Sequence, residues 1–368
     1  MAPILTRLGQ SFGFGASGDA VLPPISATGG STVENGGWKY HVFNGNGPFS
    51  IAAGTGGTVE YVVQAGGGGG GNGKTLTGAN NHYAGGGGGA GGLRTGSFTV
   101  TGGESYTISV GTGGAGRANT PDSPTSPAGG VQGSPSAVDG PGAPSFIFAT
   151  GGGGGENRIS RGPGGQPGPG ADALFSGGCG GGTINHGADQ PTTPNSSFYG
   201  GVTVASPDGI SPTVQGYRGG GNGDNNCLAA GGGGGTGAVG GNVGDSPNER
   251  AGNGGGGAQT GFPGPVLAPL VPGSPNWATI TGTNGHLGGG GGGGTKAPQN
   301  HQRGIGGGGA TEGGLGGAGG TDNENGAHAS ARTGSGGGGG ANNAGPGNSA
   351  GAGGDGSTGI VMVRYSTS

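Results

Sequence analysis

One stretch of the sequence matches the spacing of a phosphate-binding loop. Gly68 and Gly73 occupy the two glycine positions of G-x-x-x-x-G-K-[ST], and Lys74 and Thr75 complete it. Such a loop holds phosphate because a helix begins directly after the lysine and points its N–H groups at the ligand. Here the chain continues as TLTGANNHYAGGGGG, which cannot form that helix. Because glycine is so common in this chain, we attribute the match to chance and predict no nucleotide site.

The side chains that usually bind metals or perform nucleophilic catalysis are scattered. None of the histidines has the close spacing to another ligand that a zinc or iron site requires; they are His41, His82, His186, His286, His301 and His328. We expect surface or capping roles for them. Cys179 and Cys227 are too few for a disulfide framework, so we expect small buried thiols and leave their pairing open. No nucleophile–base pair can be assigned. We predict no catalytic or metal site, no cofactor and no enzyme.

Composition excludes several other classes. Only 27% of the residues are hydrophobic and 8% are charged, with a formal net charge of −4. This mild acidity argues against nucleic-acid binding, which usually requires basic stripes. No apolar stretch is long enough to span a membrane, and the first residues lack the apolar segment of a secretory signal. We therefore expect synthesis in a cytoplasm and no membrane insertion.

Glycine accounts for 115 of the 368 residues, mostly in pure runs. The longest runs are 66–71, 85–89, 151–155, 231–235, 288–294 and 336–340. A collagen reading fails because the strict G-X-Y period is missing. Polyproline-II geometry offers an ordered alternative, with three residues per turn and no internal hydrogen bonds. All N–H and C=O groups then point outward and need partners on neighbouring rods.

This geometry relates the purity of a run to its position. A rod enclosed on all sides must be glycine throughout, whereas an edge rod needs glycine only on its inner faces. We predict that pure runs are interior rods and that mixed stretches such as 313–320 are edge rods. A Cβ in an interior rod would separate its neighbours, so Gly291→Val is expected to be strongly destabilising.

A block of this kind needs fastening, because ordering glycine costs about 1–2 kcal/mol per residue or more. Alternating apolar residues predict strands around Trp38, through TVEYVVQA with Val62 and Val63, over 104–110, and at the C-terminus. We predict that the C-terminal strand GIVMVRY pairs with the N-terminal strands; its core-facing residues would be Val361 and Val363. SFIFAT, CLAA and WATITG, each ahead of a later run, are interpreted as returns to this β-unit.

The order of these parts resembles that of glycine-rich proteins of phage tails and fibres. The most specific elements are VEYVVQAGGGGGG and the exit GIVMVRY, and the resemblance covers roughly residues 28–368. The glycine runs alone are also similar to the polyglycine-II bundles of phage fibre-tip adhesins and of a springtail antifreeze protein. In the adhesins, loops between glycine rods recognise host receptors. The resemblance therefore implies a virion protein without a cofactor.

The expected fold is mainly β or irregular, with a small antiparallel β-unit built from both termini that clamps a polyglycine-II bundle. The expected divisions are a virion-docking leader (1–27), a β-unit with the first rods (28–110), a bundle with variable loops (111–358) and a closing strand (359–368). Expected partners are other virion proteins, through the leader, and a host receptor that is a glycan or an outer-membrane protein. A homo-oligomer is left open.

Recognition is expected on loops that leave the block at the end away from the β-unit. Alternating outward and inward rods from VEYVVQA predicts that rods starting at 151, 231 and 288 all run outward. The residues expected at that end are Asn80, Asn81, His82, Tyr83, Arg158, Arg250 and Lys296. Two alternatives remain: a purely architectural capsid, tail or spike protein, and a binder of ice or polysaccharide surfaces.

Overall fold

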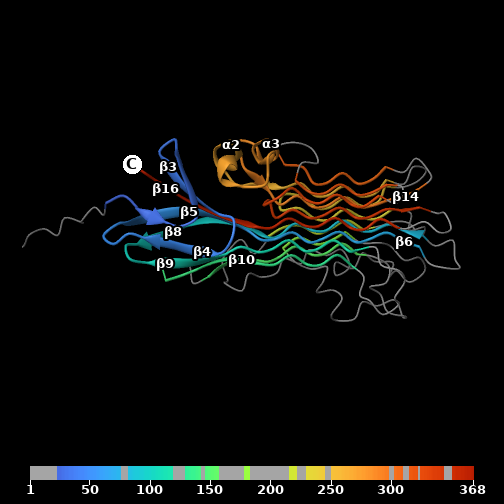
Figure 1. Ribbon diagram of the computed structural model, residues 1–368, viewed down its shortest axis with the longest axis horizontal. Coiled ribbons are helices and arrows are strands. Elements are labelled where there is room, and N and C mark those ends of the chain that lie inside the picture. The colour runs from blue at the N-terminus through green and yellow to red at the C-terminus, as the bar shows by residue number, and fades with distance from the viewer. Residues whose placement is uncertain are drawn as a thin grey trace, which may run out of the picture.

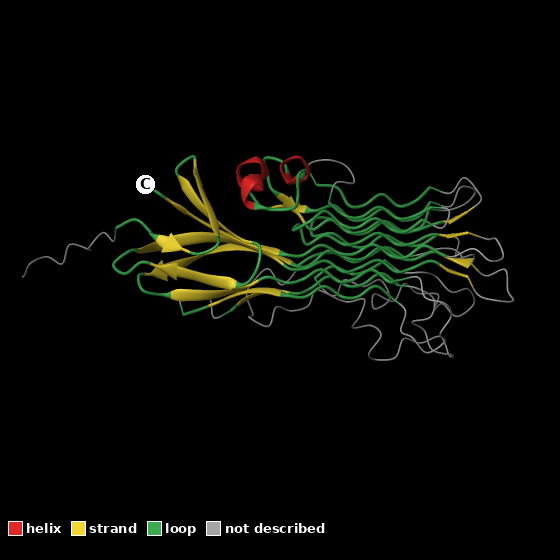
Figure 2. Ribbon diagram, in the orientation of Figure 1, coloured by secondary structure: helices red, strands yellow, loops and turns green. Residues whose placement is uncertain are grey.

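The computed structural model describes twelve stretches of the chain: 23–75, 82–118, 129–141, 146–156, 178–182, 215–221, 229–244, 250–297, 302–309, 315–321, 324–343 and 350–368. Two parts follow one another along the long axis (Figure 1). Most strands gather at one end, and a block of extended rods, drawn as loop apart from short strands at the rod tips, fills the other (Figure 2). The fold is mainly β: of the described residues, 26% lie in strands and 5% in helices.

The first sheet contains the C-terminal strand at its centre. Its order is β2-β3-β16-β5-β8, with all neighbours antiparallel; the strands are β2 (Ser31–Asn35), β3 (Trp38–Phe43), β5 (Gly56–Gln64), β8 (Leu93–Thr101) and β16 (Ile360–Ser366). Val361 lies opposite Phe43 on one side and Val63 on the other. The prediction that both chain ends build one β-unit is confirmed.

The second sheet lies over the first and encloses the larger core. Its order is β1-β4-β9-β10-β11; the strands are β1 (Ala27–Thr28), β4 (Gly47–Ile51), β9 (Ser105–Ser109), β10 (Ser136–Asp139) and β11 (Ile147–Ala149). Phe49, Tyr106 and Ile108 of this sheet pack against Val63, Val363 and other buried residues of the first. β10 belongs to the range expected to form the bundle with its loops, 111–358, whereas β11 is part of the SFIFAT segment that we had expected to return to the β-unit.

A short helical segment covers the other face of the first sheet. It comprises α2 (Gly264–Leu267), the 3₁₀ helix η3 (Ala268–Leu270) and α3 (Trp277–Thr281). Trp277 and Leu267 are buried with Val62 and Met362. WATITG therefore returns to the β-unit as expected, but as a helix. SFIFAT returns as β11, whereas Ala229 of CLAA bridges Thr295 at the opposite end of the rods, so that interpretation is wrong.

The rods are joined by backbone hydrogen bonds whose partner repeats every third residue. In the rod at 66–73, Gly67, Gly70 and Gly73 donate over 2.8–2.9 Å to a single neighbour. That neighbour is the rod at 351–357, which runs in the opposite direction. The residues in between face two other neighbours in the same manner.

Six rods enclose the rod at 66–73. Its N–H groups donate to three antiparallel rods, which are 85–91, 130–134 and 351–357. Its carbonyls accept from three parallel rods, which are 114–117, 151–155 and 335–341. Each N–H and each carbonyl from Gly66 to Gly71 is paired in this way. Pairing replaces the water that buried backbone groups lose.

The pure runs occupy the interior of the block. Four further rods have bonded neighbours on all sides; they are 85–91, 230–236, 288–295 and 334–341. The mixed rod at 315–320 bonds to four rods and lies at the rim, as predicted. The pure run 151–155 departs from the rule, because it bonds to only four described rods, although all its residues are buried.

Short polar side chains bridge neighbouring rods at the rim. Asn253 Oδ1 accepts from the Ile305 N–H at 2.9 Å, and Asp355 Oδ1 accepts from the Gly116 N–H at 2.7 Å. Asn242 and Asn325 do the same for two other rim rods. These side chains supply acceptors for backbone N–H groups that no described rod accepts, so fewer backbone donors at the rim stay open.

Candidate functional site

Rods that lead away from the sheets end together at one face of the block, the far end. Four short strands mark it: β6 (Lys74–Thr75), β7 (His82–Tyr83), β14 (Lys296–Ala297) and β15 (Asn342–Asn343). β6 pairs antiparallel with β7, β14 pairs parallel with β15, and β15 packs beside the first pair. Figure 1 shows β6 and β14 at the tips of the rods, opposite the sheets. A further pair, β12 (Ala258–Gln259) and β13 (His286–Leu287), marks the near end.

Several residues expected in recognition lie at the far end. His82 and Tyr83 form β7, and Lys296 begins β14. The backbone carbonyl of Arg250 accepts the Gly244 N–H at 3.0 Å, where an outward rod gives way to an inward one. The chain therefore brings four of the proposed residues to one face. The others lie outside the described residues: Asn80, Asn81 and Arg158.

The expected path of the chain is wrong at one rod. Gly87 and Ala90 of an inward rod donate to Gly231 and Gly234 in the same order, so the run at 231–235 leads toward the sheets. Arg250 reaches the far end one hairpin later than expected.

The error has a topological cause. The three successive described rods at 151–156, 178–182 and 215–221 all run outward. The residues between these rods lie outside the described part of the chain. Strict alternation of outward and inward rods therefore could not predict their directions.

An exposed ion pair at the far end escaped sequence analysis. Arg303 precedes the inward rod at 304–309, and Glu324 begins the inward rod at 324–330. Their side chains lie 3.6 Å apart and are more than half exposed. An exposed pair contributes little to stability, so both groups can meet a partner at small cost. The sequence offers little signal for this pair: Arg303 directly precedes a glycine, but Glu324 lies between two asparagines.

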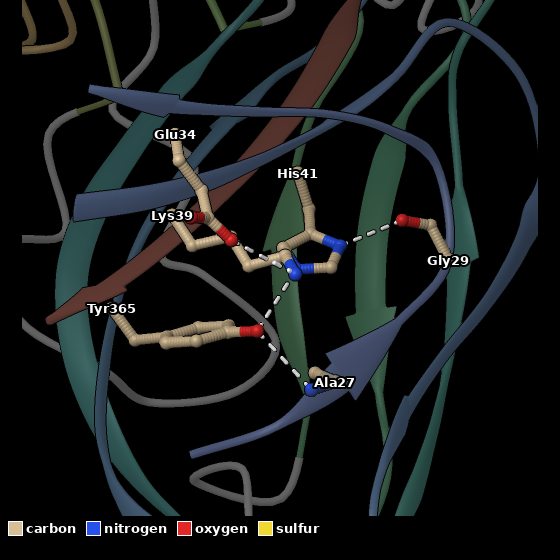
Figure 3. Close-up of polar contacts among 6 residues, drawn as sticks. All are labelled: Ala27, Gly29, Glu34, Lys39, His41 and Tyr365. Carbon is tan, nitrogen blue, oxygen red and sulfur yellow. Dashed lines mark hydrogen bonds and ion pairs between the residues drawn. The ribbon is translucent and has the colours of Figure 1, made fainter. Parts of the chain in front are cut away.

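A buried polar cluster ties the β-unit together (Figure 3). His41 Nδ1 lies 2.7 Å from the Gly29 carbonyl, and its Nε2 lies 3.3 Å from the Tyr365 hydroxyl. That hydroxyl accepts the Ala27 N–H at 3.1 Å. Neutral His41, protonated on Nδ1, satisfies every contact if Tyr365 donates to Nε2. The cluster thus fastens the chain at β1 to both β3 and the C-terminal strand.

Burial decides the ionisation of this cluster. Desolvation lowers the pKa of His41 below its usual value, opposed by the Gly29 hydrogen bond and helped by the charge of Lys39. Lys39 itself pairs with Glu34 at 3.3 Å, outside the core. Burial also raises the pKa of Tyr365. Both side chains therefore remain neutral, which suits a structural fastener.

The other groups considered for chemistry are engaged or inert. The N–H groups of Gly68 to Gly71 and of Gly73 donate to neighbouring rods, so they cannot cradle a phosphate. Complete burial raises the pKa of Cys179 to about 12, which keeps it a protonated thiol. Cys227 lies outside the described residues. Within the described ranges, no group of three or more His, Cys, Asp or Glu residues is placed to hold a metal ion.

In the part of the chain that the structure describes, no helix is long and apolar enough to cross a membrane. No protein-family model matches the sequence, and a search of curated proteins finds no match.

Proposed function

We propose that the rods are polyglycine-II helices packed as a bundle. Three features support this: the partner repeats every third residue, no hydrogen bond lies within a rod, and none of Gly66 to Gly71 has a positive φ. Three residues per turn, outward-pointing backbone groups and a negative φ define that helix. The assignment explains why a chain with few apolar residues can fill a solid block.

We further propose that the chain is a phage virion protein of the tail-fibre or fibre-tip type, located on the virion surface. The observation that carries the proposal is the convergence of rod ends on one face, remote from the β-unit. Rods end at that face in residues other than glycine, among them Lys74, Lys296 and Asn342, and loops held on a rigid scaffold are where recognition concentrates. The resemblance to phage fibre proteins supplies the host receptor, a glycan or an outer-membrane protein, as the partner.

The opposite end suits attachment to the virion. β1 begins at Ala27 and pairs with β4, so the described residues before it, 23–26, lead directly into the β-unit. We propose that the leader, 1–27, docks with other virion proteins. Residues 1–22 lie outside the described residues. Anchoring at the sheets would leave the far end facing outward.

Exchanging far-end connections tests the recognition role. Residues 76–81 and 298–301 would each be replaced by a short Gly-Asn turn, and adsorption of the virion to its host measured. The control replaces 310–314, which links an inward rod to an outward rod at the near end. We expect adsorption to fall at least tenfold for the far-end exchanges and to remain unchanged for the control.

The architectural alternative gives the opposite result. A stiff body with paired backbone groups would also suit a decoration or spike protein. Unchanged adsorption by intact virions carrying both far-end exchanges would contradict a recognition role for these two connections and favour that alternative.

A further inference from the structure

Within the described part of the chain, the strand β8 presents a long open edge. It is the last strand of the first sheet and spans Leu93–Thr101. In the second sheet, the edge strands β1 and β11 have only two and three residues. An open edge offers unpaired N–H and C=O groups to any strand that can reach it, and most proteins keep such edges short, charged or covered.

The register identifies which groups of β8 face outward. Ala65 donates to the Gly92 carbonyl, while the Leu93 N–H turns away from β5 and donates to Gln215. Antiparallel pairs alternate between hydrogen-bonded and non-bonded positions. Thr95, Ser97 and Thr99 therefore direct their N–H and C=O groups away from β5. No described residue pairs with them along this edge.

Both ends of this open segment are closed. The Gln215 carbonyl accepts the Leu93 N–H, and the Glu104 carboxylate accepts the Thr101 N–H at 2.7 Å. Between these ends the edge carries no charged side chain except Arg94, which is buried. The site is thus a strand-length, uncharged docking edge with defined limits.

The opposite edge of the same sheet is different. β2 carries Glu34, paired with Lys39 and largely exposed. Two copies of β2 brought edge to edge would place like charges close together, and charge is a common means of blocking edge pairing. The β8 edge lacks that protection.

We propose that β8 pairs with β8 of a second copy of this chain. An antiparallel two-fold axis at Ser97 sets Ser97 opposite its own copy and Thr95 opposite Thr99 of the partner. Each of these pairs exchanges two backbone hydrogen bonds, and Thr–Thr pairs favour a sheet. The two five-stranded sheets then form one continuous sheet, with the segment 95–99 at its centre.

The solution mass of the intact chain tests the proposal. We expect a dimer by light scattering coupled to gel filtration at micromolar concentration. Ser97→Pro removes one outward N–H without breaking the ladder to β5, and Thr99→Lys adds a charge to the edge. Both variants should elute as monomers with unchanged circular dichroism, whereas the matched control Thr32→Lys on the β2 edge should remain dimeric.

Crosslinking locates the contact independently of folding. Under oxidation, Ser97→Cys should form a dimer-sized disulfide species, since directly opposed residues lie about 5.5 Å apart between Cα atoms. Thr101→Cys, displaced from the axis, should not. A monomeric wild type, or variants of the β8 edge that remain dimeric, would overturn the proposal.

Discussion

Adding one methyl group at Gly291 tests the packing of the block most directly. Gly291 lies in an interior rod; its N–H donates to the Gly88 carbonyl and its carbonyl accepts from Gly233 N, both at 2.8 Å. A Cβ at this position would overlap the Gly337 carbonyl, 2.6 Å from its carbon, and would lie 3.1 Å from Gly88 N. Carbon atoms prefer separations of about 3.5–4.0 Å, so the neighbouring rod must move by about 1 Å.

The cost of Gly291→Ala follows from that movement. Overpacking a dense interior costs about 1–3 kcal/mol. The displaced rod also weakens the 2.8 Å bond from Gly88 N to the Gly337 carbonyl, and a buried group left unpaired costs about 1–3 kcal/mol. Together the two contributions predict a loss of about 2–6 kcal/mol in the free energy of unfolding.

A rim glycine provides the matched control. Gly256 lies in a rim rod, and a Cβ there would meet only the Gly308 carbonyl oxygen, at 3.6 Å. Gly256→Ala should be neutral or stabilise by up to about 1 kcal/mol, because alanine restricts the unfolded chain. Urea unfolding of both variants measures the difference. Equal stabilities for Gly291→Ala and Gly256→Ala would refute the account of enclosed rods.

Four further perturbations address the clamp and the rim. Deleting 359–368 should lower the unfolding midpoint of the whole body, seen as loss of amide protection in the rods, because β16 is the central strand that joins both chain ends; fraying of the sheet alone would contradict this. Arg364 donates to Glu60 at 2.6–2.8 Å, and its guanidinium lies 4.5–4.6 Å from the ring centroids of Trp38 and Phe262. Arg364→Lys should therefore lower the free energy of unfolding by about 1–3 kcal/mol, measured by thermal unfolding, because an ammonium cannot reproduce the planar contacts. The pKa of His41 is lowered from 6.5 in the folded protein, so the unfolded chain binds the proton more readily. The free energy of unfolding should therefore be highest above about pH 6.5 and fall as the pH drops toward the folded pKa. His41→Gln should flatten this pH dependence in urea titrations. Asn253→Ala removes the acceptor of the Ile305 N–H at an exposed rim and should cost only about 0.5–1.5 kcal/mol in the same assay.

Sequence was sufficient for the parts of the fold that depend on side-chain pattern. Alternating apolar residues identified β3, β5 and β9, and GIVMVRY was correctly assigned to the same β-unit. The purity of the runs predicted most of the enclosed rods, because only glycine lets backbones approach on every side; the run 151–155 is the exception. Lys296 was placed at the far end because its run directly follows a segment anchored near the sheets.

Other features had no local signal. The helices at 264–281 are short, and their position depends on Trp277 meeting Val62 and Met362 across the sheet. His41 gave no sign of its bond to Tyr365, which lies 324 residues away in the sequence. The bridging roles of Asn253 and Asp355 depend on which rod happens to lie beside theirs.

The sequence by itself determined that the glycine runs can pack and that the termini must hold them. Only the tertiary structure decided which rod lies beside which, and in what direction each one runs. The physical reason is that pure glycine runs are chemically identical, and a rod with a three-residue repeat accepts parallel and antiparallel neighbours equally well. Neighbour and direction are therefore set by the rims, the connections and the β-unit, whose contacts join residues far apart in the chain.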